Sequence, residues 1–464
     1  MTRKNRWIIF AAVVATLCIG IFLVWALLYT RAGAEKLINA ALGSSGEKNA
    51  QTVAGLVPTF LGYDHPRTVL LLFLNNTELR PGGGFIGSYG VVTFDHGIPQ
   101  QFVTNGTENL DYGAPATFNV PPPAPINDHL IARWLFRDSN WSPDFAESSR
   151  RALRFYAAEG GDRADKIETV IGVTPMVLET LLKYTGPLTA SGTTYTADTI
   201  TDALEYTVEQ QYLKTGTPKS ERKAVLGDLS RALVSGLAHI APSKWYAMSQ
   251  EIFGLLSRGQ IIAYDVNADT QKTIEDLGWG GRMHDGAEDF LMQVDANLGS
   301  LKTDRVMQRA LEYTLFRDAP SGEWHAKISA TYTNTATKID WRTTRYKTYT
   351  RWYLPLGTEF LGETTSTTAL AAAREIHTWD ISAENNRPVF GTFFVVEPGQ
   401  TKTMSFIVRV APNIAAAITA HTYGLYVQKQ LGVPEIKLTV HHNFGKSYDW
   451  TGMIQQDKIF PETI

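Results

Sequence analysis

The first feature of the chain is an uncharged apolar run from Ile8 to Tyr29. At about 1.5 Å per residue, a helix of roughly 20 apolar residues spans the hydrocarbon core of a bilayer. A helix also satisfies its own backbone polar groups in that solvent. The run therefore predicts a transmembrane anchor at residues 8–29. A cleaved signal peptide is the alternative, because Ala32, Gly33 and Ala34 form a loose cleavage site, although the run is longer than an ordinary signal core.

Basic residues on either side of this run predict its orientation. Arg3, Lys4 and Arg6 precede it, and only Arg31 follows it closely. The positive-inside rule places the more basic flank in the cytoplasm. We therefore expect residues 1–7 to be cytoplasmic, with a single-pass anchor in the cell membrane and the body of the protein outside the cytoplasm.

The next part of the chain alternates between helical and strand patterns. Residues 30–62 have apolar positions at helical spacing, which predicts a membrane-proximal helical stalk. From Arg67, a continuous apolar run of strand length predicts a strand buried on both faces of a sheet. Helices and strands then follow one another, so we expect one layered α/β domain at residues 63–304.

From about Arg305 the pattern changes to short runs rich in Thr, Val, Tyr and Phe, punctuated by Gly, Pro and Asn. That spacing is typical of antiparallel strands and predicts an all-β sandwich at residues 305–447. Residues 448–464 are expected to form a C-terminal tail. The predicted fold class is thus an α/β domain followed by a β-sandwich, behind one transmembrane helix.

Composition excludes several functions for the 464-residue chain. Its one cysteine, Cys18, lies in the apolar run, so the exported body has no disulfide, cysteine nucleophile or cysteine-based zinc site. The net charge is −3, and without the three basic residues before the apolar run it becomes about −6, which argues against a nucleic-acid partner. Neither an HExxH pair nor a GxSxG elbow occurs.

The first candidate for chemistry is the glycine-rich turn NNTELRPGGGFIGSYG, which follows the buried strand. Such a turn can present backbone N–H groups to an anion, and Arg80 can clamp a phosphate. A strand follows and no Gly-Lys-Ser/Thr occurs, which excludes a nucleotide-binding loop. The alternative is a tight turn in which glycines supply positive φ and Glu78 pairs with Arg80. Arg80 is a candidate catalytic residue, and the candidate ligand-binding residues are Asn75, Asn76, Glu78, Gly82, Gly83 and Gly84.

The second candidate is FRDSNWSPDF, a polar cluster beside two aromatic residues and ahead of a predicted helix. Arg137 and Asp138 are candidate catalytic residues, and Asn140 and Asp144 are candidate ligand-binding residues. Their side chains suit a sugar or a divalent cation. They equally suit a network that caps the helix and pins the loop.

Two further clusters lie later in the chain. Arg222 and Lys223 come early in a predicted helix and are candidate ligand-binding residues, with a solvated charged face as the alternative. Asn297, Lys302 and Asp304 lie at the junction of the two sequence patterns. We interpret that junction as a structural strap between domains.

Several of these stretches resemble one bacterial surface family, known only as domain of unknown function 4012. The resemblance rests on LLLFLNNTELRPGGGFIGSYGVVTFDHG, RDSNWSPDF, IETVIGVTPMVLETLLKYTGPL and SERKAVL, and it extends over most of residues 50–435. It implies an architecture and a topology but no reaction.

A more distant resemblance is to the LytR-CpsA-Psr phosphotransferases, single-pass enzymes that move glycopolymers from a polyprenyl-pyrophosphate carrier to the cell wall. The order of elements is similar, and Arg80, Arg137-Asp138 and Arg222-Lys223 take the places of that family's charged residues. Two departures weaken the case for magnesium binding and transfer. The first strand ends in Asn75, Asn76 and Glu78 rather than in an aspartate, and Arg222-Lys223 replaces a fuller arginine cluster.

The resemblance implies a membrane-anchored, extracytoplasmic cell-envelope protein that binds a polyprenyl-pyrophosphate-linked glycan. If it also transfers that glycan to the cell wall, magnesium held by Glu78 or Asp138 would stabilise the developing charge. The expected partners are the bilayer, through residues 8–29, and a lipid-linked glycan or cell-wall polymer. The alternative is a non-enzymatic surface scaffold or an adhesion or assembly protein. If Arg80, Arg137 and Arg222 converge beside an apolar groove, glycan binding is favoured over the scaffold alternative.

Overall fold

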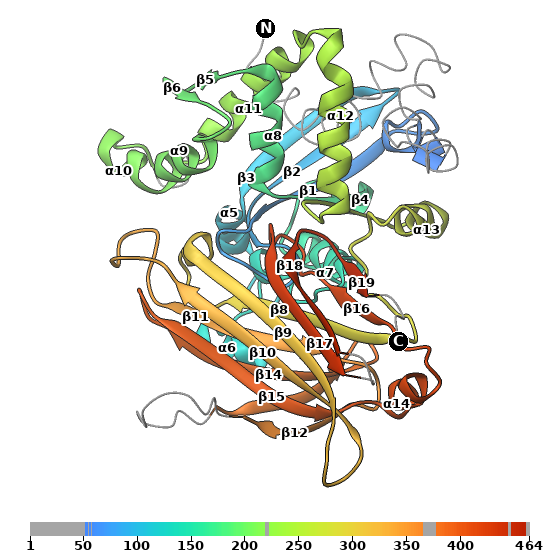
Figure 1. The fold of residues 1–464 in the computed structure, drawn as a ribbon. Helices are drawn as coiled ribbons and strands as arrows, with labels where there is room; N and C mark the ends of the chain where they lie inside the picture. Colours follow the sequence, from blue (N-terminus) through green and yellow to red (C-terminus); the bar gives the residue numbers. More distant parts are fainter. Residues whose placement is uncertain are drawn as a thin grey trace, which may run out of the picture. The chain divides into compact units, whose positions relative to one another are not determined.

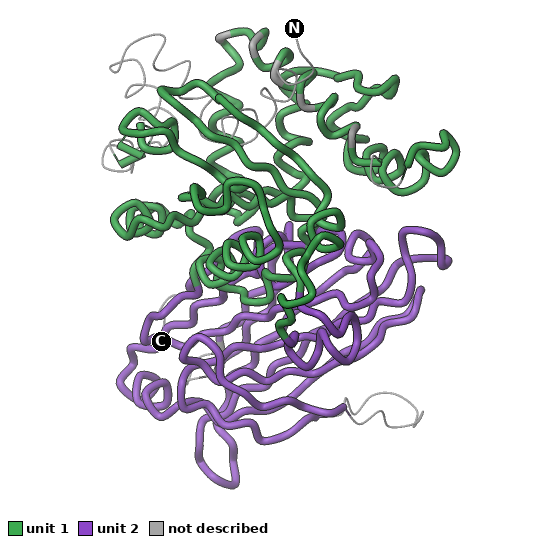
Figure 2. The backbone as a smooth tube through the Cα atoms, turned by 180° about the vertical axis from the view of Figure 1, so that it is seen from behind, with its two compact units in different colours: residues 1–75, 85–120, 135–282 green, residues 76–84, 121–134, 283–464 purple. Residues whose placement is uncertain are grey.

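The computed structural model divides into two compact units, drawn in green and purple in Figure 2. It describes residues 52–53, 55–56, 58–218, 222–364, 377–443 and 447–460. The first unit contains the described residues up to Asn75 together with 85–120 and 135–282, and the second contains 76–84, 121–134 and 283–464. The chain therefore leaves the first unit and returns to it twice before its final departure.

A five-stranded mixed sheet in the order β3-β2-β1-β4-β7 forms the centre of the first unit. β1 pairs antiparallel with β2 and parallel with β4, so the apolar strand predicted from Arg67 is the middle strand. Its residues from Val69 to Leu72 are buried, as the continuous apolar run indicates. The strands are β1 (Arg67–Asn75), β2 (Phe85–Asp95), β3 (Ile98–Gly106), β4 (Ile167–Val173) and β7 (Ile261–Asp265), with a separate hairpin of β5 (Leu188–Ala190) and β6 (Thr193–Tyr195).

Helices bury both faces of this sheet (Figure 1). Val69 and Leu71 of β1 share one core cluster with residues of α8, α11 and α12. On the other face, a Cβ added to Gly172 of β4 would lie 3.1 Å from the ring of Phe145 in α7, so the glycine permits close packing. The helices are α5 (Thr107–Gly113), η4 (Phe136–Asp138), α7 (Phe145–Ala158), η5 (Ala164–Lys166), α8 (Pro175–Thr185), α9 (Ile200–Tyr206), the π-helix η6 (Thr207–Gln211), α10 (Tyr212–Thr215), α11 (Ala224–Ala238), α12 (Pro242–Ser257) and α13 (Ala268–Asp276).

The predicted helical stalk and anchor have different outcomes. Val53, Leu56 and Phe60 are helical and buried in the core of the first unit, so the described part of residues 30–62 is core rather than stalk. The predicted anchor at 8–29 lies outside the described residues. Within the described ranges, no helix has the length and apolar character needed to cross a bilayer.

Two six-stranded sheets form the second unit, in the orders β12-β15-β10-β9-β17-β18 and β13-β14-β11-β8-β16-β19. Side chains of both sheets share one core cluster, in which Trp352 of β11 contacts Phe406 of β15 at 5.2 Å between ring centroids. The β-rich C-terminal region predicted from the sequence is therefore present. The strands are β8 (Asp289–Asn297), β9 (Met307–Arg317), β10 (Trp324–Asn334), β11 (Tyr346–Tyr353), β12 (Glu359–Glu363), β13 (Trp379–Glu384), β14 (Arg387–Val396), β15 (Thr401–Arg409), β16 (Leu425–Gln428), β17 (Ile436–Asn443), β18 (Ser447–Ile454) and β19 (Lys458–Phe460), and the helices are α6 (Ala124–His129), η8 (Thr303–Val306) and α14 (Pro412–Thr419).

The second unit is longer than the sequence pattern indicated. β8 pairs with β11 and β16, so the C-terminal segment of this unit begins at residue 283 and not at 305. Every residue of β8 is buried, so it lacks the alternating pattern that marked the later strands. The expected tail at 448–464 is also wrong in its described part, because β18 and β19 complete the two sheets.

Candidate functional site

The glycine-rich turn belongs to the second unit, where its charged residues are buried. Arg80 is 2% exposed and Glu78 is 7% exposed. Arg80 Nη2 donates to Glu78 Oε1 at 3.2 Å, and Nη1 donates to the carbonyl oxygen of Asn297 at 2.6 Å. The structural alternative is therefore confirmed for this pair, and the guanidinium of Arg80 has partners within its own unit.

Further hydrogen bonds hold the turn against the strands of the second unit. Asp304 Oδ2 accepts from the backbone N–H of Leu79 at 2.9 Å and from Asn297 Nδ2 at 2.8 Å. Gln430 Nε2 donates to the carbonyl oxygen of Arg80 at 3.2 Å. Arg309 pairs with Asp304 as well. The expected strap residues Asn297 and Asp304 thus act inside the second unit, where they fix the turn.

Glycines in this turn allow a close approach between two backbone segments. Gly83 and Gly84 have φ of 110° and 146°, a region that favours glycine. A Cβ added to Gly432 would lie 1.9 Å from the carbonyl oxygen of Gly83. Asn76 Nδ2 donates to the carbonyl oxygen of Gly432 at 2.8 Å. The N–H of Gly83 donates to Arg80 O at 3.0 Å, as in a structural turn rather than an anion nest.

Arg137 lies in the first unit, in a buried cluster of carboxyl groups. Its Nε pairs with Asp111 of α5, which is 3% exposed. Glu159, at the C-terminal end of α7, accepts from the backbone N–H of Phe136 at 2.7 Å through Oε1. Burial, then the hydrogen bond to Asp111 and the charge of that residue, raise the pKa of Glu159 to about 8. The neutral, protonated form of Glu159 is therefore favoured beside Asp111.

The Asp111 carboxyl and two tyrosines belong to the same cluster. Burial raises the pKa of Asp111, and the charge of Arg137 opposes that rise. Burial also raises the pKa of Tyr89 to about 12. The rings of Tyr89 and Tyr156 meet edge to face at 5.3 Å, so aromatic side chains border the carboxyl groups. The sequence analysis missed Asp111 and Glu159, because neither lies in a recognisable motif.

Arg222 and Lys223 are partly buried and form ion pairs, so the expected solvated face is wrong. Arg222 Nη2 lies 3.1 Å from Glu108 Oε1, and Lys223 Nζ lies 2.6 Å from Glu108 Oε2. Arg222 also pairs with Glu209. Burial raises the pKa of Glu108, but the charge and hydrogen bond of Lys223 outweigh it, so the net shift is downward.

Three of the candidate basic residues form ion pairs with helix α5 of the first unit. Glu108 and Asp111 are three residues apart and therefore lie on the same side of the helix. Through them, α5 contacts Arg222, Lys223 and Arg137. Arg80 belongs to the second unit. More carboxyl groups than basic side chains lie around α5. The carboxyl groups are those of Glu108, Asp111, Asp138, Glu159 and Glu209.

The remaining residues of the FRDSNWSPDF cluster cap and pin α7. Asp144 is the N-cap of this helix and accepts from the backbone N–H of Glu147 at 3.1 Å. Its other oxygen accepts from Arg282 Nε at 2.7 Å. Asn140 is buried, and Ser142 donates to Glu147 at 2.6 Å. This arrangement confirms the capping interpretation for Asp144.

The predicted magnesium ligands belong to different units, Glu78 to the second and Asp138 to the first. In the part of the chain that the structure covers, no three His, Cys, Asp or Glu side chains are placed to hold a metal ion. Asn75, the last residue of β1, is also in the first unit, apart from the turn that begins at Asn76. A magnesium site at Glu78 or Asp138 stays a prediction.

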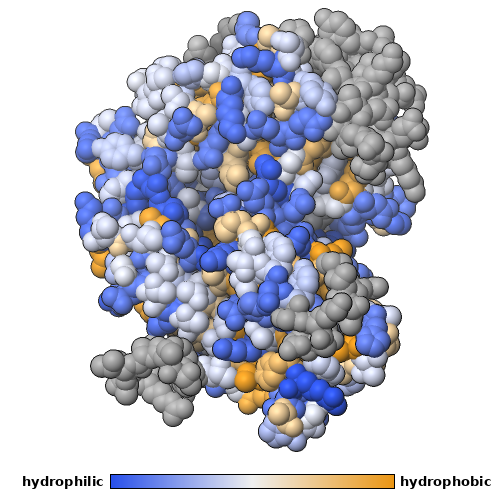
Figure 3. Space-filling view, viewed as in Figure 1, coloured by the Kyte–Doolittle hydropathy of each residue, from blue (hydrophilic) through white to orange (hydrophobic). Residues whose placement is uncertain are grey.

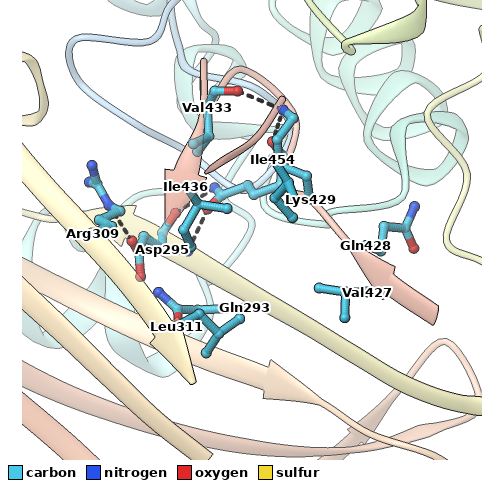
Figure 4. A pocket seen from close by; sticks show the side chains of 11 residues that line it. Gln293, Asp295, Arg309, Leu311, Val427, Gln428, Lys429, Val433, Ile436 and Ile454 are labelled. Atoms are coloured by element: carbon cyan, nitrogen blue, oxygen red, sulfur yellow. Dashed lines mark hydrogen bonds and ion pairs between the residues drawn. The ribbon is translucent and has the colours of Figure 1, made fainter. Parts of the chain in front are cut away.

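A small cavity lies inside the second unit (Figure 4). Its volume is about 20 Å³, which suffices for one water molecule and not for a sugar. Figure 4 shows Arg309 joined to Asp295 and Lys429 joined to Val433, so the charged side chains at its wall already have partners. On the face drawn in Figure 3, hydrophobic residues are scattered among hydrophilic ones, as on most protein surfaces.

Residues 64–209 match the model of a family described as "Protein of unknown function (DUF4012)". This segment is similar to that family. The match begins just before β1, ends within η6, and includes the glycine-rich turn and the FRDSNWSPDF cluster. The resemblance to this family is therefore confirmed over residues 64–209, and the family's description names no activity. The comparison with curated proteins finds no match.

We expect Gly432→Ala to destabilise the second unit by about 2 kcal/mol more than Gly399→Ala. Both glycines have positive φ, 77° and 73°, but only at Gly432 would a Cβ meet backbone, the carbonyl of Gly83. The difference therefore isolates the close approach of the turn. This difference in unfolding free energy is measured by urea titration, with unfolding of the second unit monitored by hydrogen exchange of its peptides. Equal losses in the two variants would contradict the role given to Gly83.

Protonation of Glu159 predicts a pH dependence for the first unit. Its pKa is raised from 4.5 to about 8 in the fold, so its contribution to stability is complete below pH ~4.5 and is lost as pH rises through ~8. Within that window, stability should fall by up to about 1.4 kcal/mol per pH unit. Glu159→Gln should remove this slope, because the amide can still accept from Phe136 and donate to Asp111. Exposed Glu435→Gln is the control, and an unchanged slope in Glu159→Gln would refute the assignment.

Proposed function

We propose that this protein is a membrane-anchored, extracytoplasmic cell-envelope protein that acts as a non-enzymatic scaffold. The proposal rests on one observation: the basic residues that could bind a phosphate already form ion pairs with carboxylates. Arg80, Arg137, Arg222 and Lys223 all hold carboxylate partners within their own units. A pyrophosphate would have to displace those partners, because each cation is already neutralised.

Burial makes that displacement costly. Arg80 is 2% exposed, and the side chains of Arg222 and Lys223 are 12% and 14% exposed. Removing one member of a buried ion pair leaves the other charge without compensation, at about 3–5 kcal/mol. The carboxyl groups around α5 also outnumber the cations there, which favours cations over anions as neighbours. Ion pairs of this kind are typical of basic side chains that stabilise loops.

The membrane part of the proposal rests on the sequence. The apolar run at 8–29 is long enough to span a bilayer, and Arg3, Lys4 and Arg6 precede it. An anchored body of this size, with two folded units and no cysteine outside the run, suits an envelope protein stabilised by packing.

A second candidate function is binding of a polyprenyl-pyrophosphate-linked glycan, with transfer to the cell wall, as the likeness to LytR-CpsA-Psr phosphotransferases implies. One observation favours it, namely that Arg137, Arg222 and Lys223 all reach α5. For this function, Glu108 and Asp111 must release these cations to the pyrophosphate. Magnesium would then add the positive charge that the cluster lacks.

Thermal unfolding of the full chain in nanodiscs separates the two functions. We expect no change in Tm on adding a polyprenyl pyrophosphate, with or without magnesium. A ligand at 100 times its Kd would add about 2.7 kcal/mol to the stability of the native state, which corresponds to a rise of roughly 5 °C or more. Arg222→Gln serves as the matched variant. A rise in the wild type that Arg222→Gln abolishes would replace the scaffold with the glycan-binding function.

The anchor has its own test. We expect the full chain to remain in the membrane pellet after alkaline extraction, and the variant lacking residues 8–29 to be released. Protease added to intact spheroplasts should digest the body of the full chain, because we place it outside the cytoplasm. Digestion only after the membrane is opened would overturn the proposed topology.

A further inference from the structure

One long strand at the edge of the second unit lacks the usual protection against pairing. β13 ends its sheet and pairs with β14 at all six positions without a register shift. Across the described residues, β14 is its only strand neighbour. The outer edge of such a strand presents N–H and C=O groups that can extend the sheet.

Two other edge strands of this unit, β12 and β19, are shorter than β13. β12 has a register shift between Phe360 and Gly362, and β19 contains three residues. β13 reads WDISAE, with neither a proline nor a lysine, the residues that commonly block an edge. β18, with eight residues, is the other long edge strand and provides a comparison.

Apolar side chains on the interior face of the sheet extend as far as Ile381 on the edge strand β13. This residue is 63% exposed, although its register partner on β14 is the buried Phe390. Trp379, on the same face of β13, contacts Phe360 and Trp352 at 5.0 and 5.6 Å between ring centroids. Ile381 therefore continues the apolar interior of the two sheets to the outer edge of β13.

We propose that β13 pairs antiparallel with β13 of a second copy of this chain, with Ile381 opposite Ile381. This register places Trp379 opposite Ala383 and Asp380 opposite Ser382, and symmetry repeats both pairs. Apolar side chains then meet apolar side chains, and no like charges lie directly opposite each other. The partner is a second copy because this strand is complementary to itself.

The acidic residues of β13 do not oppose the pairing, because they already have partners on their own sheet. Asp380 accepts from Tyr349 at 2.9 Å, and Arg351 pairs with Glu384 at 2.7 Å. Pairing joins two six-stranded sheets into one of twelve strands across the two copies. This inference deepens the scaffold proposal, on which it rests, by naming the partner that the scaffold assembles with.

Single-cysteine variants of the full chain test the register directly. Cys18→Ser removes the only native thiol, so a cysteine introduced elsewhere can cross-link only to its counterpart. Directly opposed residues have Cα atoms about 4.5–5.5 Å apart, which lies within the range of about 4.4–6.8 Å found in disulfides. Ile381→Cys should therefore give a disulfide-linked dimer under mild oxidation. Ile339→Cys, which is 61% exposed and lies outside the strands, and Met453→Cys on β18 should remain monomeric.

Light scattering of detergent-solubilised chain gives a second readout. Ile381→Lys should convert the dimer to a monomer with an unchanged circular dichroism spectrum, whereas Ile339→Lys should leave the dimer intact. Cross-linking at 453 or 339 that matches 381, or a dimer that survives Ile381→Lys, would overturn the proposed pairing. A glycan-dependent rise in Tm would defeat the scaffold function and leave the pairing itself intact, so the two failures are distinguishable.

Discussion

A buried guanidinium must keep its hydrogen-bond partners, since an unpaired charge in a protein interior costs several kcal/mol. In the second unit, Arg80 meets this requirement through Glu78 and Asn297 and so holds the glycine-rich turn. In the first, Arg67 of β1 donates to Thr169 of β4 at 3.0 Å and pairs with Asp265 of β7, which ties three strands together. Positive side chains that suggest ligand chemistry in the sequence thus act as cross-links in the fold.

Local patterns in the sequence predict the elements well where one rule dominates. Pro175 and Gly186 bound α8, because proline fits the first helical turn and glycine accepts the positive φ after the last. The pattern fails at β8, whose residues are all buried and so lack alternation. The pairing of Glu78 with Arg80 was predictable because the two residues are close in sequence, whereas Glu108 and Arg222 meet only when the chain folds.

Short helix α5 is where the candidate basic residues of the first unit meet carboxylate partners. Its two acidic residues bind cations that enter from η4 and from the start of α11. Glu159 adds a further carboxyl beside Asp111, with a pKa raised to about 8. The sequence alone does not reveal these pairs, because Asp111 and Glu108 are separated along the chain from Arg137 and Arg222.

The glycine-rich turn also constrains the order in which the molecule can be completed. Residues 76–84 are made early, yet their partners Asn297, Asp304 and Gln430 are made more than two hundred residues later. During synthesis, Arg80 therefore lacks these partners while the strands of the first sheet are already complete. A chain that ended before residue 283 would contain every strand of the five-stranded sheet and none of these three partners of the glycine-rich turn.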